Sequence, residues 1–217
     1  MTNVLAARIP RARIRPLVLV VLVVLAFASI ARTPATAGED MPPRIVVETY
    51  YATLVNVLQK AKTLGFQGRY KALDPAIRRS FDIPFMARVA VGHYWRKFAK
   101  DQQSLVAEKM HELSTATYAS RFNSYAGEKF EVLKSATTAR GDVIVHTQIV
   151  KSNGKEVKIN YLLRKRGQDW RIIDVHLKGT ISELAKWRAD FSSVLRRKGY
   201  GGLIAAIDKK VATLKSE

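Results

Sequence analysis

The chain has 217 residues, 47% of them hydrophobic, and a formal net charge of +19 at pH 7. This length and apolar content suit one folded domain with a sizeable core. The absence of cysteine excludes disulfide bonds, thiol catalysis and cysteine-ligated metal sites.

The N-terminal segment has the features of a secretory signal peptide. Arginines precede an apolar run at residues 17–30, and Ala-Thr-Ala at residues 35–37 matches a signal-peptidase site. The run is shorter than the roughly twenty residues that cross a bilayer core. We therefore expect a signal peptide at residues 1–37 and a single exported domain at residues 38–217, with an uncleaved N-terminal anchor as the alternative.

The exported domain stays strongly basic after this segment is removed. Residues 1–37 hold five arginines and no acidic residue, so the formal charge falls from +19 to +14. In an exported protein such a charge favours anionic lipid headgroups or an acidic protein surface over nucleic acid. A surface kept soluble by its charge is the alternative.

Helical periodicity dominates the first part of the exported domain. Apolar residues at spacings of three and four predict a helix over residues 47–64 that stops at Gly65. Asp74 followed by Pro75 predicts the start of a short helix. Asp82 likewise predicts the cap of a further helix, in which Gly92 is an interruption.

A longer helix is predicted from a cap at Asp101 to Gly127. It carries two apolar stripes, one formed by Val106, Met110, Leu113, Ala116 and Thr117 and the other by Tyr118, Phe122 and Tyr125. A single stripe is enough for packing against one neighbour. The second stripe indicates either cover on both sides or a face that lines a cavity, with a well-packed core helix as the simpler alternative.

From Lys129 the apolar period changes to two, which is typical of strands. A first strand begins there, and further strands are predicted at residues 143–149, 157–163 and 170–177. The turn signal Ser-Asn-Gly at residues 152–154 separates two of them. This spacing predicts an antiparallel meander whose fourth strand is apolar on both faces.

The C-terminal part is again helical. Thr180-Ile181-Ser182-Glu183 is a capping-box pattern that predicts a helix start. Glycines 199, 201 and 202 precede a last amphipathic helix. The order of helices, strands and helices predicts an α+β fold in which a curved antiparallel sheet of about four strands is packed by N-terminal and C-terminal helices.

Motifs for chemistry are sparse. The sequence contains no phosphate-binding loop, no G-x-S-x-G, no H-E-x-x-H and no calcium loop. The four histidines, His93, His111, His146 and His176, are scattered over predicted helices and strands, so we expect no metal site and no cofactor. Basic runs such as residues 164–166 lack interleaved aromatics, so nucleic-acid binding is not expected.

One pair of residues offers an enzymatic alternative. By strand alternation Asp174 shares a face with Trp170, Ile172 and His176, and a carboxylate beside an imidazole in an apolar pocket is a candidate acid–base pair. The favoured interpretation is a strand-end Asp held by a helix cap or by an arginine such as Arg188. We expect no catalytic residue and no enzyme.

A family resemblance rests on four segments that follow one another along the domain: FDIPFMARVAVGHYWRKF, TYASRFNSYAG, NYLLRKRGQDWRIIDVHLKGTISE and WRADFSSVLRR. Together they resemble the MlaC-type, toluene-tolerance (Ttg2-type) family of periplasmic lipid-binding proteins. The segment LGFQGRY at residues 64–70 is most similar to the HpnM branch, which is linked to hopanoids.

The resemblance implies a carrier in the periplasm that holds phospholipid or hopanoid tails in an apolar cavity between sheet and helices. It implies transport between the inner and outer membranes, with an inner-membrane lipid transporter, an outer-membrane lipoprotein complex and the membrane surface as partners. The candidate lipid-binding residues in these regions are Met86, Val89, Tyr118, Phe122, Tyr125, Val145, Ile149, Tyr161, Leu163 and Trp170. A membrane-anchored assembly subunit and the enzyme that uses Asp174 and His176 stay as alternatives.

Overall fold

The computed structural model describes residues 42–216, so the predicted signal peptide lies outside the described part of the chain. The elements are α1 (Pro43–Gln59), α2 (Ala61–Ser80), α3 (Ile83–Val91), the 3₁₀ helix η1 (Gly92–Lys97), α4 (Lys100–Arg121), β1 (Lys129–Thr137), β2 (Val143–Val150), β3 (Glu156–Arg166), β4 (Asp169–Leu177), β5 (Ile181–Ser182) and α5 (Glu183–Ser216). Among these helices, none is at once long and apolar enough to cross a bilayer.

The strands form one antiparallel sheet in the order β1-β2-β3-β4-β5, so each strand pairs with its neighbour in the sequence. The α+β fold and the antiparallel meander are as predicted, and the two-residue β5 is an addition. Burial alternates strictly along β2, whose Val143 and Val145 point inward. This alternation is what a sheet with one covered face requires.

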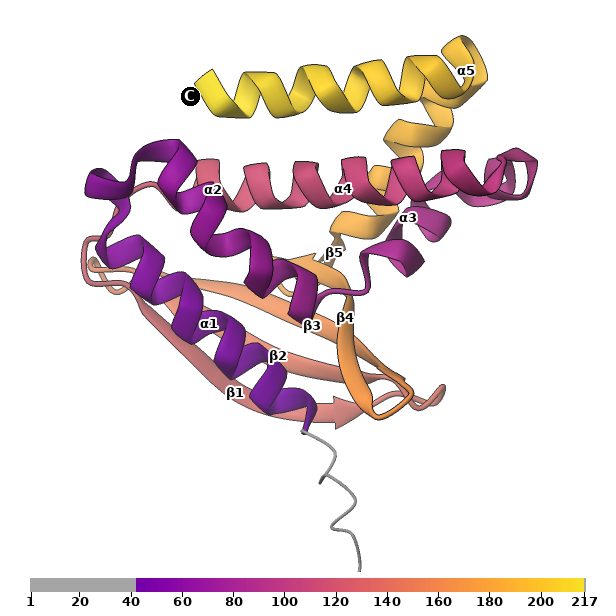
Figure 1. Ribbon diagram of the computed structural model, residues 1–217. Coiled ribbons are helices and arrows are strands. Elements are labelled where there is room, and N and C mark those ends of the chain that lie inside the picture. The colour runs from indigo at the N-terminus through magenta and orange to yellow at the C-terminus, as the bar shows by residue number, and fades with distance from the viewer. Residues whose placement is uncertain (1–41, 217) are drawn as a thin grey trace, which may run out of the picture. The chain divides into compact units, whose positions relative to one another are not determined.

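The helices lie on one side of the sheet (Figure 1). Helix α1 lies directly on the strands and contacts β1, β2 and β4, whereas α4 packs against α2, α3 and α5. Val47 and Leu54 of α1, Leu73 of α2 and Met110 of α4 are fully buried. Each such side chain contributes roughly 1.5–3 kcal/mol through its burial.

Two irregularities interrupt the ladders. One shifts the register of β1 against β2 between Val132 and Lys134, and Leu133 is 48% exposed at that bulge. The guanidinium of Arg44 on α1 donates hydrogen bonds to the carbonyls of Val132 (3.0 Å) and Leu133 (3.3 Å). The other shift places Leu162 opposite Asp174 and Leu163 opposite Ile172, which leaves one extra residue in β4.

The first helical segment differs from its prediction. Helix α1 ends at Gln59, and Gly65 kinks α2 (φ 58°) instead of ending a helix. A positive φ of this kind is accessible to glycine without steric cost. Pro75 lies inside α2 and does not begin a new helix. Its fixed φ is compatible with a helix, although the missing N–H removes one backbone hydrogen bond from that turn.

The prediction for α3 is confirmed, but that for α4 is wrong at both ends. Asp82 caps α3 by accepting a hydrogen bond from the Phe85 amide (3.0 Å). Helix α4 begins after Ala99, so Asp101 lies in its first turn and is not its cap. It ends at Arg121, well before Gly127, because the chain runs into Asn-Ser, which favour turns over helix interiors.

Helix α5 begins two residues later than the capping-box pattern predicts. Ser182 is the effective cap, since its hydroxyl accepts the Ala185 amide hydrogen bond (2.9 Å), while Ile181 and Ser182 form β5. Gly199 (φ 61°) kinks α5 as expected from the glycine cluster. The kink allows the C-terminal half of α5 to lie along α4 (Figure 1).

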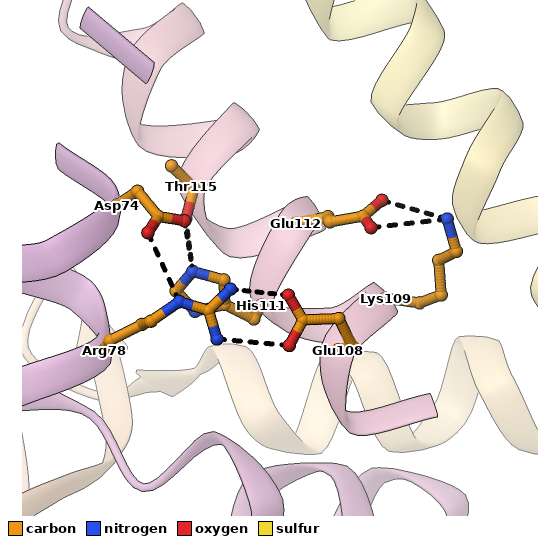
Figure 2. Close-up of polar contacts among 7 residues, drawn as sticks. All are labelled: Asp74, Arg78, Glu108, Lys109, His111, Glu112 and Thr115. Carbon is orange, nitrogen blue, oxygen red and sulfur yellow. Dashed lines mark hydrogen bonds and ion pairs between the residues drawn. The ribbon is translucent and has the colours of Figure 1, made fainter. Parts of the chain in front are cut away.

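A polar network joins α2 to the first half of α4 (Figure 2). Buried His111 lies 2.6 Å from Asp74, and Arg78 bridges Asp74 (3.3 Å) and Glu108 (2.5 Å). Partial burial acts to raise the pKa of Asp74, but the hydrogen bond with His111 and the charge of Arg78 outweigh it and hold the pKa below its ordinary value.

A second ionic cluster joins α4 to α5. Lys109 lies 3.1 Å from Glu112 on its own helix (Figure 2) and 2.9 Å from Asp208 on α5. The hydrogen bonds to Asp208 and Glu112 raise the pKa of Lys109. The first half of α4 is therefore fixed to a neighbouring helix on each side.

Candidate functional site

An apolar cavity of about 190 Å³ lies between the inner face of the sheet and helices α3, α4 and α5. Its sheet wall is made by two strands. Ile159 and Tyr161 of β3 point into it, and their partners across the ladder, Leu177 and Val175 of β4, point the same way. The alternation of side chains along paired strands places these four on one face.

The helical wall comes mainly from the second half of α4. Ser114, Thr117, Tyr118 and Arg121 are spaced by three and four residues, so they occupy one face of the helix. The C-cap residue Phe122 continues this face, and its ring stacks on Tyr118 with centroids 5.8 Å apart. The wall is completed by Phe81 and Met86 near α3 and by Glu183 and Trp187 on α5.

The polar side chains along this wall differ in whether they already have hydrogen-bond partners. The hydroxyls of Ser114 and Thr117 donate to the carbonyls of Met110 (2.8 Å) and Leu113 (2.7 Å) on their own helix, so they are already satisfied. The charged groups of the wall are Arg121 and Glu183, on the adjoining ends of α4 and α5. The cavity therefore has apolar walls and one charged end, which suits an amphiphilic ligand.

Beneath the cavity lies a cluster of aromatic rings in edge-to-face contact. The ring of Tyr50 lies 5.3 Å from Phe81, 5.5 Å from Tyr118 and 6.3 Å from Tyr161, measured between centroids. Burial raises the pKa of Tyr50 and of Tyr161 well above the ordinary value, so both phenols stay neutral. The floor of the cavity is thus aromatic and uncharged.

An open groove adjoins the cavity between α4 and α5. It has a volume of about 440 Å³ and shares Thr117, Arg121, Glu183 and Trp187 with the cavity. Apolar residues of both halves of α5, including Phe191 and Ile207, line its walls together with charged residues such as Lys186 and Asp190. A ligand that enters past Arg121 and Glu183 meets both hollows.

Four of the predicted lipid-binding residues, Met86, Tyr118, Phe122 and Tyr161, are brought together in the wall of this cavity. The other six lie elsewhere. Val145, Leu163 and Ile149 are buried in the sheet, and Val89 is half-buried on α3. Tyr125 is 39% exposed beyond the end of α4, and Trp170 lines a separate hollow against α1 and α2. Tyr125 leaves the predicted aromatic stripe because α4 ends before it. Lipid contact by any of the ten stays a prediction.

Sequence reasoning missed several wall residues. Ile159 alternates with Tyr161, so period two was a sufficient signal for it. Val175 and Leu177 were hidden by the extra residue in β4, which reverses the alternation after Ile172. The pairing of Arg121 with Glu183 depends on tertiary packing and leaves no local sequence signal.

The same bulge corrects the prediction for Asp174. Since Val175 and Leu177 point into the cavity, Asp174 and His176 alternate onto the opposite face and do not share the face of Ile172. The Asp174 carboxylate accepts hydrogen bonds from the Leu184 amide (3.0 Å) and the Ser182 hydroxyl (2.6 Å) at the start of α5. It is a capping group, as the favoured interpretation held, and its partners do not include Arg188.

His176 lies 3.2 Å from Asp174 and is separated from His146 by Asn160 on the intervening strand β3. The two histidines are therefore not on neighbouring strands. Within residues 42–216 no three His, Asp or Glu side chains are grouped so that they could hold a metal ion.

Comparison with known proteins indicates the family and the fold. The family model described as MlaC protein matches residues 48–209. Among solved structures, the chain resembles the phospholipid-binding protein from Ralstonia solanacearum in complex with a phospholipid, with a TM-score of 0.71 and 21% identity over 80% of this chain and 99% of that chain. This likeness shows a shared fold. No curated protein sequence matches the chain.

Proposed function

The chain belongs to the MlaC family, and we propose that it is a periplasmic lipid carrier that holds lipid tails in the cavity under α4. The observation that carries this proposal is the polarity of the cavity. Its walls are apolar and aromatic, and its charges are gathered at one end, at Arg121 and Glu183. A binding role, without catalysis, fits the use of Asp174 as a helix cap.

The energetics of carrying need no covalent chemistry. Each methylene removed from water contributes about 0.8 kcal/mol, so a long acyl chain is held by burial alone. Release then needs a membrane or partner that is equally apolar. The phospholipid bound to the Ralstonia protein supports a phospholipid as cargo for this fold.

The size of the cavity sets a condition on binding. Its volume of about 190 Å³ is smaller than the 300–1,000 Å³ that is typical of sites for drug-sized ligands. A two-chain lipid therefore requires the walls to separate or the adjoining α4–α5 groove to take part of it. We infer that one chain enters the cavity and that the groove receives the remainder.

A hopanoid is the second candidate cargo, and the segment at residues 64–70 supports it through its effect on the cavity wall. Gly65 kinks α2, and buried Arg69 donates hydrogen bonds to the carbonyls of Ala61 (2.9 Å) and Ala119 (2.8 Å). Because Ala119 lies on the cavity-lining half of α4, this segment fixes the position of that wall. A rigid polycyclic lipid needs a cavity of defined shape, which such bracing provides.

Transport between the inner and outer membranes requires docking surfaces, and a basic corner supports this part of the proposal. Arg96, Lys97 and Lys100 lie around η1, and residues 196–198 (Arg-Arg-Lys) precede the kink of α5. Phe98 and Tyr200 pack edge to face across these segments with centroids 5.0 Å apart. None of these cations has an ion-pair partner within residues 42–216, and the acidic residue nearest in the sequence is Asp101.

We propose that this corner docks on anionic membrane surfaces and on acidic patches of an inner-membrane transporter and an outer-membrane lipoprotein complex. Export by a signal peptide at residues 1–37 completes the proposal. N-terminal sequencing of the secreted protein tests it: a chain that begins at Gly38 supports cleavage, and an intact N-terminus supports the anchored assembly subunit.

The decisive experiment is native mass spectrometry of the protein purified from its exporting host, followed by denaturing extraction and lipid analysis. A bound mass that resolves to phospholipid supports the phospholipid carrier, and one that resolves to a hopanoid supports the second cargo. A protein of uniform unliganded mass, under conditions in which a known lipid carrier keeps its lipid, would contradict the proposal.

A further inference from the structure

The charged end of the cavity contains an ion pair that is poorly formed. The Nη2 atom of Arg121 lies 4.0 Å from Oε2 of Glu183, at the outer limit for an ion pair. The Arg121 side chain is 51% exposed, whereas that of Glu183 is only 12% exposed. Arg121 is the one ion-pair partner of Glu183 among residues 42–216.

Helix ends explain part of this arrangement. Arg121 is the last residue of α4 and Glu183 the first of α5, so each charge complements the dipole of its own helix. This accounts for the residue types but not for the burial of Glu183 at the wall of an apolar cavity. A largely buried carboxylate is stabilised by close hydrogen-bond donors or a close cation, and Arg121 at 4.0 Å is at the outer limit for such a contact.

Lys186 and Lys210 line the adjoining groove together with Glu183, but among residues 42–216 neither forms an ion pair with it. The Thr117 hydroxyl, one turn before Arg121 in α4, is bonded to the Leu113 carbonyl. Trp187, one turn after Glu183 in α5, lines both the cavity and the groove. The Glu183 carboxylate is therefore free to accept hydrogen bonds from a ligand at this end of the cavity.

From these contacts we propose that Arg121 and Glu183 together form a receptor for a zwitterionic headgroup of the phosphoethanolamine type. The guanidinium donates hydrogen bonds to the phosphate oxygens, and the carboxylate accepts them from the ammonium group. A headgroup with both charges close together inserts into the 4.0 Å pair and replaces one weak contact by two direct ones. The inference rests on the carrier function proposed above and specifies its cargo.

Other headgroups are matched less well. An anionic headgroup without an ammonium group, such as phosphoglycerol, satisfies Arg121 but leaves Glu183 unpaired beside an added negative charge. An uncharged hopanoid offers a charged partner to neither group. The pair therefore acts as a filter on the headgroup, independently of the tails, which the apolar walls accept without regard to charge.

The test compares two lipids with identical acyl chains, phosphatidylethanolamine and phosphatidylglycerol, titrated separately into delipidated protein and followed by native mass spectrometry. For the wild-type protein we expect about tenfold tighter binding of phosphatidylethanolamine, the value of a hydrogen bond to a largely buried charge. Glu183→Gln should remove this preference. Arg121→Gln should weaken both lipids by only about fivefold, because the arginine is half exposed.

Matched controls are Glu156→Gln on β3 and Arg140→Gln in the β1–β2 turn, which neutralise exposed charges that do not line the cavity. Both should keep the wild-type preference. Equal binding of the two lipids by the wild-type protein would overturn the headgroup inference while leaving the carrier function intact, and this outcome depends on no variant. A preference that persists in Glu183→Gln would overturn it as well. Failure of the wild-type protein to bind either lipid would contradict the carrier function and the inference together.

Discussion

The two halves of α4 are both covered by protein, yet they differ in how their polar groups are used. In the first half, His111, Glu108 and Lys109 join networks to α2 and α5 with contacts between 2.5 and 3.3 Å (Figure 2). In the second half, the face around Tyr118 borders a cavity and ends at the 4.0 Å pair of Arg121 with Glu183. Burial is therefore no guide to function along this helix. The feature that distinguishes the site is a loosely formed ion pair beside a cavity.

Filling the cavity should have the largest effect on lipid binding. Thr117→Trp puts an indole into the space at the boundary of cavity and groove, so we expect loss of most of the co-purifying lipid. Native mass spectrometry measures the occupancy. Thr213→Trp, at an exposed position of α5, is the matched control and should stay loaded. Full occupancy in Thr117→Trp would exclude this cavity as the lipid site.

Truncations in the two halves should differ in their cost to stability. Met110→Ala removes a fully buried side chain from the packed half and should lower the free energy of unfolding by about 3 kcal/mol. Phe122→Ala removes a half-buried ring that already borders a cavity, so it should cost about 1 kcal/mol while changing lipid binding. Urea denaturation of both variants measures the difference. Equal losses would show that the second half is packed as tightly as the first.

The assignment of Asp174 as a cap predicts a variant that is weakened but functional. Asp174→Asn replaces one acceptor oxygen by an amide, so the bond from the Ser182 hydroxyl is lost and stability should fall by about 1.5 kcal/mol. Lipid occupancy should be unchanged, because Asp174 is absent from the cavity wall. A variant that keeps its stability and its bound lipid but loses its biological function would instead support the enzyme alternative.

The polar network of the first half of α4 should make the stability of the protein depend on pH in the acid range. The pKa of Asp74 is lowered in the folded protein, so its stabilising contribution is present above the unfolded value of 3.8 and is lost as the pH falls through the folded pKa. Thermal unfolding between pH 6 and 3 should therefore show a smaller drop for Asp74→Asn than for the wild-type protein, by about 1 kcal/mol. Parallel curves would exclude a role for this carboxylate.

Much of the fold was predictable because local signals and tertiary structure agree. Period-two alternation located β2 within one residue and β3 within three. Of the two alternatives that the second apolar stripe of α4 left open, a face that borders a cavity holds for Tyr118 and Phe122. The strand signals succeed where one face of the sheet is covered, since burial then forces the alternation.

The failures have equally specific causes. The bulge in β4 places Asp174 and Val175 on the faces opposite to those predicted, and no residue type in that strand indicates a bulge. The end of α1 at Gln59 was missed, because the apolar spacing continues through Ala61 and Leu64 to the break at Gly65. The contact of Arg121 with Glu183 joins residues that are remote in sequence, so it follows from packing alone.

The bulge at Leu133 has a consequence for self-association. Strand β1 is at the open edge of the sheet, where unpaired backbone groups invite the strand of another molecule. The bulge breaks the regular spacing of those groups, and Arg44 already occupies the carbonyls of Val132 and Leu133. A second chain that approached this edge would find its hydrogen-bonding ladder interrupted at mid-strand, so the exposed edge is protected against the growth of intermolecular β-sheet.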